Sequence, residues 1–306
     1  ADVTLHSFGN KRLLFNPVYI SDVCVNDCAY CGFRNSNRDF SRTTLTTNQV
    51  LSEVEFVLSR GVRKILLLAG EYGRNAYTKM IFRAIRAIKD TYPDIWVGLE
   101  SAPLEEEDYH LYNNVGLDSV ILFQETYSKQ TYEKHHGKVG PKSNYDYRRN
   151  ALAKAVNAGI EEVGFGVLFG LTDPVKEMYK MHRHANEIKA LNPKVKIRFS
   201  FPRMQFASGQ TESNHLQVTE KTLTRLIVAT RLAFPESRIV LTARETQGFR
   251  LGLLDIVTDI GEGGSTMVGG YTVNNKGSQY SQFSLPGIGK LNVFKDHITG
   301  RGYELA

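Results

Sequence analysis

Residues 16–31 read NPVYISDVCVNDCAYC, a short apolar run that leads directly into three cysteines. The run at 18–21 consists largely of β-branched and aromatic residues, which predicts a strand. Cys24, Cys28 and Cys31 then share one loop, with three and two residues between them. In parallel α/β folds, the loops after the carboxyl ends of strands carry the chemistry. The stretch therefore predicts an α/β fold with a metal-binding loop after an early strand.

The alternation of strand and helix continues along the chain. Short apolar runs predict strands at 64–69, 95–99, 119–123, 163–167, 196–200 and 238–242, and helical patterns occupy 51–59, 77–88, 147–157, 176–191 and 221–234. Strands that alternate with helices are parallel and joined by crossovers. An eighth strand near Ile256 would close a (β/α)8 TIM-type barrel. A doubly wound open sheet is the alternative, but it does not need the polar residues that follow most of these strands.

We expect one barrel domain at 16–271 and a carboxy-terminal tail at 272–306 that closes the barrel, because no repeat or linker divides the chain. The formal charge of +6 is dispersed, which indicates ordinary solubility rather than nucleic-acid binding. No run of eighteen apolar residues occurs, so we expect no membrane span. The first ten residues do not resemble a signal peptide, and the sequence leaves open whether residues precede Ala1.

The cysteines themselves narrow the chemistry. Only three occur, all within eight residues, so they cannot form a disulfide framework. They favour a reducing compartment, and we expect the cytoplasm. Three thiolates can hold three irons of a [4Fe–4S] cluster and leave the fourth iron open to a small molecule. A structural zinc site is the alternative, but it takes four ligands, and the fourth would have to come from far along the chain.

The spacing of Cys24, Cys28 and Cys31 resembles the signature of the radical S-adenosylmethionine (SAM) superfamily. The resemblance implies that SAM chelates the open iron and that one electron, from a reductant such as flavodoxin or ferredoxin, releases a 5′-deoxyadenosyl radical. Tyr30 resembles the aromatic residue that these enzymes place against adenine. A non-catalytic metal-binding protein remains the alternative of a different class.

Further strings resemble the aromatic amino acid lyases, namely the 2-iminoacetate synthases and the tryptophan lyase that makes 3-methyl-2-indolic acid. They are NPVYISDVC (16–24), CAYCGFRNSNR (28–38), LLLAGE (66–71), FQETY (123–127), GPKSNYDYR (140–148), GFGVLFGLTD (164–173), FSFPR (199–203), LTARE (241–245) and GGY (269–271). The resemblance implies hydrogen abstraction from the amino group of an α-amino acid and cleavage of a carbon–carbon bond. Tyrosine, giving dehydroglycine and p-cresol, is the first expectation. Tryptophan, or a non-aromatic amino acid in a retuned pocket, is the alternative.

The same resemblance assigns residues to SAM. Gly70 and Glu71 match the loop that receives the SAM amino group through a backbone carbonyl. Ser101, Glu125 and Arg148 match groups that bind the SAM ribose and carboxylate. A structural ion pair between Glu125 and Arg148 is the alternative. Gly164 and Gly166 would let adenine approach the strand closely.

Substrate residues follow in the same way. Tyr19 and Arg244 match positions that hold the amino acid carboxylate, for which a planar guanidinium is well suited. Arg203 is equally compatible with a substrate ligand and with an ion pair at the barrel mouth. His135 and His136 follow a helical segment, and we expect them on a surface turn.

The chain departs from the lyases before residues 269–271. Two serines of the lyases lie near the substrate there, and Gly261 and Gly264 replace them. Glu262, between them, could meet a cationic group of a substrate, but exposure in a glycine-rich loop is favoured. No cysteine follows Cys31, so the carbon monoxide and cyanide chemistry of the hydrogenase-cofactor branch is not expected.

Overall fold

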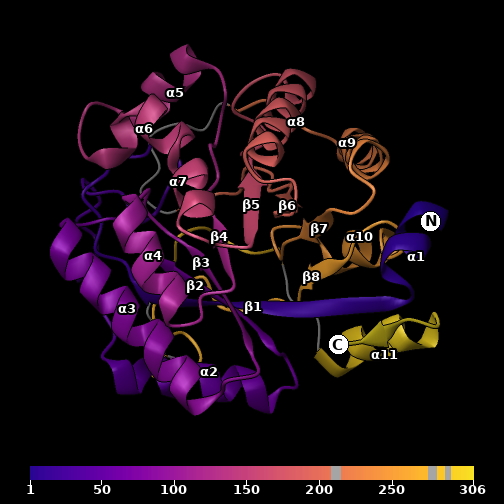
Figure 1. The fold of residues 1–306 in the computed structure, drawn as a ribbon, viewed down its shortest axis with the longest axis horizontal. Helices are drawn as coiled ribbons and strands as arrows, with labels where there is room; N and C mark the ends of the chain where they lie inside the picture. The colour runs from indigo at the N-terminus through magenta and orange to yellow at the C-terminus, as the bar shows by residue number, and fades with distance from the viewer. Residues whose placement is uncertain (208–214, 275–280, 287–290) are drawn as a thin grey trace.

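The computed structural model describes residues 1–207, 215–274, 281–286 and 291–306. Its centre is a ring of parallel strands (Figure 1). The strands are β1 (Lys11–Ser21), β2 (Lys64–Ala69), β3 (Trp96–Glu100), β4 (Ser119–Ile121), β5 (Glu162–Gly166), β6 (Lys196–Ser200), β7 (Arg238–Leu241), β8 (Asp259–Gly261) and β9 (Glu304–Leu305). Strand β1 pairs with both β2 and β8, so β1 to β8 form a closed barrel. The expected (β/α)8 architecture is confirmed.

Helices cover the outside of this ring (Figure 1). They are α1 (Asp2–Phe8), α2 (Thr47–Ser59), α3 (Arg74–Thr91), α4 (Glu106–Asn114), α5 (Lys129–His136), α6 (Tyr145–Arg149), α7 (Ala151–Asn157), α8 (Pro174–Leu191), α9 (Glu220–Ala233), α10 (Gln247–Gly252) and α11 (Leu291–Gly300). Strand β2 reads KILLLA and is almost entirely buried, because helices cover one face and the barrel interior receives the other. Thr46 caps the amino end of helix α2 and exchanges hydrogen bonds with Gln49 in a capping box.

Two expected elements differ from those observed. The eighth strand is β8, a few residues after Ile256, because the Ile256 and Val257 amides both donate to Leu253 O and form a turn there. The single helix expected at 147–157 is two helices, α6 and α7, which meet at Asn150. Beyond residue 271, the tail contributes α11 and β9, and β9 pairs with the start of β1.

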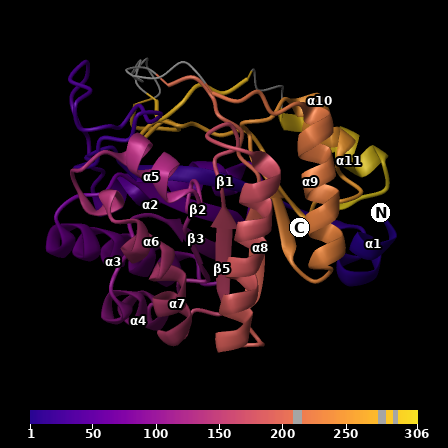
Figure 2. The same cartoon turned by 90° about the horizontal axis from the view of Figure 1, so that it is seen from above.

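The loops that follow the strands gather on one side of the barrel (Figure 2). The loop after β1 carries the three cysteines, and the loop after β7 carries Arg244. Chain segments that are far apart in sequence therefore contribute to one site. In the parts of the chain that the structure describes, no helix is long and apolar enough to cross a membrane.

Candidate active site at the carboxyl ends of the strands

The cysteine loop begins directly after β1. Cys28 is buried, whereas Cys24 and Cys31 are half-buried, and all three are free thiols. Burial raises the pKa of Cys31 to about 11 and also raises the pKa of Cys24 and Cys28. The thiols also lie close enough to affect one another: Cys24 and Cys31 contribute to the raised pKa of Cys28, and Cys24 to that of Cys31. Three thiols grouped on one loop suit a [4Fe–4S] cluster with one open iron, and binding iron requires each thiol to lose its proton.

Asn26 fixes this loop to two others. Its Nδ2 donates to Glu71 Oε2 at 2.7 Å, after β2, and its Oδ1 accepts from the Lys142 amide at 2.9 Å. Gly70 permits the close approach of the two loops, because a Cβ at that position would collide with the carbonyl of Val23. The cysteines are thus held against the loop that was expected to receive the SAM amino group.

Four buried charged side chains form a network beside the cysteine loop. Arg148 donates to Glu71 Oε1 at 3.1 Å, and Lys142 donates to Glu125 Oε1 at 2.6 Å. Arg148 also lies 3.9 Å from Glu125 and donates through Nε to Phe123 O at 2.7 Å. Burial opposes ionisation of Glu125, but Lys142 and Arg148 outweigh it and lower the pKa of this carboxyl. Glu71, Glu125 and Arg148 therefore do come together, and Lys142, which the sequence did not single out, completes the charge balance.

Tyr30 makes a hydrogen bond to a buried histidine. Burial lowers the pKa of His136, so its ring is neutral. Its Nδ1 lies 2.8 Å from Tyr132 O and donates to it, so Nε2 accepts from the Tyr30 hydroxyl at 2.6 Å. The expectation of a surface turn at His135 and His136 is wrong. Both side chains are buried, because the cysteine loop packs on them and the Ala29 amide donates to His135 O.

Three further positions expected to contact SAM lie just after β3 and in the last residues of β5. Ser101 is buried just after β3, and its hydroxyl donates to Ala102 O at 3.3 Å. A Cβ at Gly166, the last residue of β5, would collide with the ring of Phe123, and one at Gly164 would lie 2.7 Å from Ile121. At both glycines, the space that a side chain would need is therefore already filled, by Ile121 at the end of β4 and by Phe123 just after it.

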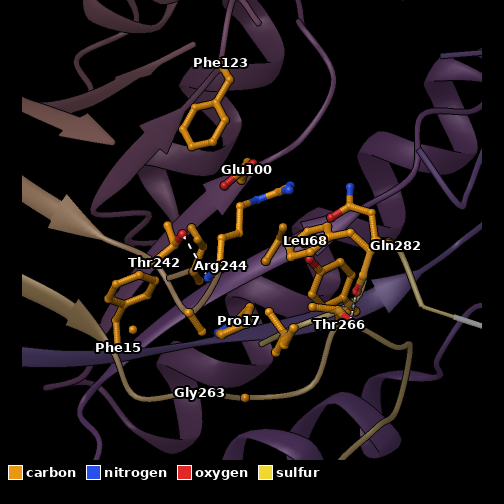
Figure 3. A pocket seen from close by; sticks show the side chains of 17 residues that line it. Phe15, Pro17, Leu68, Glu100, Phe123, Thr242, Arg244, Gly263, Thr266 and Gln282 are labelled. Atoms are coloured by element: carbon orange, nitrogen blue, oxygen red, sulfur yellow. Dashed lines mark hydrogen bonds between the residues drawn. The ribbon is translucent and has the colours of Figure 1, made fainter. Parts of the chain in front are cut away.

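A pocket opens among the same loops (Figure 3). Most of its wall is apolar, from Phe15, Pro17, Leu66, Leu68, Phe123, Ala243, Phe283 and Leu285. The polar side chains that line it are Tyr19, Glu100, Thr242, Arg244, Thr266 and Gln282. Figure 3 shows Arg244 extending into the pocket from the loop after β7 and Glu100 entering it from β3. A ligand here would meet an apolar wall and two opposite charges.

Arg244 and Tyr19 lie together in this pocket, as the sequence predicted. The guanidinium of Arg244 stacks on Phe283, with Cζ 3.4 Å from the ring centroid. Among the described residues it makes no side-chain hydrogen bond or ion pair, so its donors are available to a ligand. The Tyr19 hydroxyl donates to Gln282 Oε1 at 2.7 Å, and burial raises the pKa of Tyr19, which keeps it a neutral donor.

Glu100 is a pocket residue that sequence reasoning missed. It is the last residue of β3, one position before the predicted Ser101. Burial, and then the neighbouring charge of Glu125, raise the pKa of Glu100 to about 7. The rule that carboxyl ends of barrel strands carry chemistry could have found it. Gln282 and Phe283 were missed as well, and no sequence signal marked them.

The loop at 261–264 forms the floor of the pocket. Gly261 and Gly264 line it directly, so backbone atoms face the pocket at the two positions where the lyases have serine side chains. The expectation that Glu262 is exposed is wrong, because only 3% of its surface is accessible. Asn16 Nδ2 donates to Glu262 Oε2 at 2.6 Å, and Arg60 from the end of α2 forms an ion pair with Oε1. The carboxylate is therefore paired beneath the floor.

Arg203 holds a different position. Its guanidinium binds both carboxylate oxygens of the buried Glu245, and it also donates to Val218 O at 2.8 Å. Of the two interpretations weighed from the sequence, the structure contains the ion pair at the barrel mouth. Arg203 is not among the described residues that line the pocket of Arg244.

Comparison with known proteins agrees with this geometry. Residues 18–185 match the family model described as the Radical SAM superfamily. The 2-iminoacetate synthase of Escherichia coli (strain K12) is 31% identical over 284 residues, which are 92% of this chain and 74% of that protein. A crystal structure of HydG, a maturase of the [FeFe]-hydrogenase, has a TM-score of 0.91 at 32% identity and covers 100% of this chain and 67% of its own. For HydG from Carboxydothermus hydrogenoformans the TM-score is 0.92 at 28% identity, with 100% and 70% covered.

Proposed function

This chain belongs to the radical SAM superfamily, and from that premise we propose that it is a lyase that cleaves the Cα–Cβ bond of tyrosine. The products would be dehydroglycine and p-cresol. The family identifies the chain as an enzyme that uses a [4Fe–4S] cluster and SAM. When bound, these two cofactors supply the 5′-deoxyadenosyl radical that abstracts a hydrogen atom from the substrate.

Arg244 is the observation that carries the proposal. Its guanidinium lines the pocket and has no hydrogen-bond or ion-pair partner among the described residues, although burial lowers its pKa and so disfavours its charge. Arg244 is half-buried, and a charge partly removed from water without a partner is unfavourable, so its retention favours an anionic ligand group. A guanidinium suits a carboxylate because it can donate two parallel hydrogen bonds. The aromatic side chains of Phe15, Phe123 and Phe283 offer edges and faces to an aromatic ring.

Each group of residues then has a role. Cys24, Cys28 and Cys31 would hold the cluster. Glu71, Glu125 and Arg148, with Lys142, form a balanced set of donors and acceptors for the polar groups of SAM.

Further contacts would position the two organic molecules. Tyr30 would contact adenine, while Gly70 and Ser101 shape the surrounding loops. Tyr19 and Arg244 would orient the substrate, and the apolar wall would exclude water from the reacting atoms.

The test is anaerobic reconstitution with iron and sulfide, followed by dithionite, SAM and single amino acids. We expect 5′-deoxyadenosine and p-cresol with tyrosine. Formation of 3-methyl-2-indolic acid would reassign the substrate to tryptophan, and turnover with a non-aromatic amino acid would indicate a retuned pocket. Absence of 5′-deoxyadenosine with every amino acid would contradict the lyase proposal and favour a non-catalytic metal protein.

The physiological setting follows from the same chemistry. The cluster needs a low-potential electron, so we propose a flavodoxin or a ferredoxin as the reductant. Three free thiols suit a reducing compartment, and we propose the cytoplasm. Reduction of the reconstituted protein by each candidate donor, followed by 5′-deoxyadenosine formation, tests the first point.

A further inference from the structure

We propose that Glu100 binds the α-ammonium group of the amino acid substrate and accepts one of its protons, so that a neutral amine enters the radical step. The inference rests on the proposed function, because it requires an amino acid in the pocket of Arg244. It concerns a residue that the sequence strings did not single out.

The position of Glu100 is the first argument. The residue ends β3, and its side chain lines the same pocket as Arg244, which comes from the loop after β7 (Figure 3). Within the described parts of the chain, the Glu100 carboxylate accepts no hydrogen bond and forms no ion pair. A carboxylate can accept up to about four hydrogen bonds, so this one retains its full capacity.

The pairing of charges is the second argument. Glu100 and Arg244 are the two charged side chains among the described residues of the pocket wall. They do not form an ion pair with each other within 4.0 Å, so each remains available to a ligand. An α-amino acid carries one anionic and one cationic group on the same carbon atom. Arg244 can take the carboxylate and Glu100 the ammonium, which leaves the side chain to the apolar wall.

The chemistry of hydrogen abstraction explains why a proton must move. Removing a hydrogen atom from an ammonium group would leave a radical that carries a full positive charge in a mostly apolar pocket, which is unfavourable. If one proton passes from the ammonium nitrogen to Glu100 Oε, the electron pair of that N–H bond stays on nitrogen as a lone pair. The amine is then neutral, Glu100 is a neutral acid, and no oxidant or reductant is used.

The electrostatic surroundings bring the pKa of Glu100 closer to that of an ammonium group. Burial and the repulsion from Glu125 raise the pKa of Glu100 to about 7, and Arg244, Lys142 and Arg148 limit the rise. Tyr19 also faces Glu100, but burial raises its pKa and keeps it neutral. An α-amino group titrates near pH 8 in peptides. The ammonium group of a free amino acid is a weaker acid, because a carboxylate shares its α-carbon. The raised pKa of Glu100 therefore narrows the difference between donor and acceptor without removing it. Proton transfer is efficient when the two pKa values are close.

The test compares binding of two ligands to reconstituted holoenzyme with SAM and no reductant, so that no turnover occurs. The ligands are L-tyrosine and 3-(4-hydroxyphenyl)propionate, which lacks only the amine. For Glu100→Gln we expect tyrosine to bind at least about ten-fold more weakly, the loss of one charge-assisted hydrogen bond. The amine-free ligand should change by less than about three-fold. Equal losses for both ligands, or no loss for tyrosine, would overturn the ammonium contact.

Glu107→Gln is the matched control, because Glu107 lies exposed on α4, 3.9 Å from Arg74. It should leave binding of both ligands unchanged. Glu100→Asp keeps the carboxylate and should recover part of the affinity for tyrosine. Circular dichroism and SAM binding establish that each variant is folded. If wild-type holoenzyme binds no amino acid, the proposed function itself fails; if it binds tyrosine and Glu100→Gln does so equally, only the role of Glu100 fails.

The proton transfer has a separate readout. At saturating tyrosine, the rate of 5′-deoxyadenosine formation in the wild type should rise with pH to a plateau, with its midpoint near pH 7. In Glu100→Gln the rate should be lower throughout, and this inflection should be absent. A Glu100→Gln profile that matches the wild type in height and midpoint would overturn the role of Glu100 as proton acceptor.

Discussion

The hydroxyl of Tyr271 fills the space into which a side chain at position 264 would project. A Cβ built on Gly264 would collide with that oxygen and lie 3.0 Å from Tyr271 Cζ. The hydroxyl is held there because it donates to Pro17 O at 2.8 Å and accepts from the Ser265 amide at 3.3 Å. In this chain the Tyr271 hydroxyl therefore occupies the space that a serine side chain at position 264 would need.

Restoring the serine alone should destabilise the protein. In Gly264→Ser the new side chain would displace the Tyr271 hydroxyl, and overpacking typically costs about 1–3 kcal/mol. Adding Tyr271→Phe removes the colliding oxygen, so the double variant should be more stable than the sum of the two single changes predicts. Chemical denaturation of all three variants measures this coupling. Additive losses would show that the two side chains do not compete for space.

Arg244→Lys should weaken substrate binding while SAM binding stays unchanged. Lysine keeps the charge but cannot donate two parallel hydrogen bonds to a carboxylate, so we expect a loss of about ten- to a hundred-fold in affinity for tyrosine. Arg203→Lys is the control, because Arg203 binds Glu245. That variant should lose stability and retain the affinity. Equal affinity losses in both variants would contradict the assignment of Arg244.

Cys24→Ala should remove the cluster. Iron is held by thiolates, and losing one of three ligands leaves too few to retain a [4Fe–4S] cluster. After anaerobic reconstitution the wild type should be brown with broad visible absorbance, and the variant should lack this absorbance and most of its iron. Ser41→Ala serves as the control, because Ser41 is exposed further along the same segment and its hydroxyl has no hydrogen-bond partner among the described residues. A colourless wild type that contains zinc would contradict the cluster.

Glu100→Gln should stabilise the ligand-free protein at alkaline pH. The pKa of Glu100 is raised to about 7 by burial and by Glu125, so its contribution to stability is full below its ordinary pKa of 4.5 and is lost as pH rises through 7. Gln cannot ionise, so the two proteins should differ little at pH 4.5. By pH 8.5 the variant should be more stable by about 2–3 kcal/mol, measured by urea denaturation. A difference that does not grow with pH would contradict the raised pKa.

Asp259→Asn should be among the most destabilising single changes at the opposite end of the barrel. Asp259 is buried, yet Lys64, Arg198 and Arg238 outweigh the effect of burial and hold its pKa low. Its neutralisation leaves these cations underpaired, which costs about 3–5 kcal/mol for a buried pair. Glu161→Gln breaks the exposed pair with Lys196 and should cost at most about 1 kcal/mol.

The pH dependence of this cluster has the opposite sign to that of Glu100. Because the pKa of Asp259 is lowered, its contribution to stability is present above its ordinary pKa of 3.8 and is lost as the pH falls through the lowered value. The stability of the wild type should therefore fall more steeply in acid than that of Asp259→Asn. If the two proteins lose stability equally steeply as the pH falls, this assignment is contradicted.

Local hydrophobic patterns in the sequence predicted most strands of the barrel, but they did not predict which polar side chains are buried at its mouth. Strands such as β2 and β6 are dense apolar runs, and their predicted bounds match those observed. Strand β8 is only three residues long, and its register is set by pairing with β1 and β7, so its position was not visible locally. Glu262 is buried because Arg60, 202 residues away, pairs with it. Partners at such separations have no local signature.

The same limit explains the site residues that were missed. The sequence around Lys142 is typical of a polar loop, and that around His136 is typical of the end of a helix. Both side chains become buried only when the cysteine loop packs on them. Glu100 differs, because its place directly after a predicted strand was visible in the sequence. The strand was predicted to end at residue 99, so attention to the residue directly after it, rather than to Ser101, would have identified Glu100.

The hydrogen bond between Tyr19 and Gln282 spans 263 residues and therefore sets an order of events during synthesis. Ribosomes add about 5–20 residues per second, so roughly 13–50 seconds separate the appearance of the two side chains. The three cysteines emerge early in that interval, whereas Gln282 and Phe283 complete the pocket wall only at its end. Until then the thiols belong to a chain whose pocket wall is incomplete. Iron delivery and protection from oxygen must therefore come from other molecules until Gln282 and Phe283 are in place.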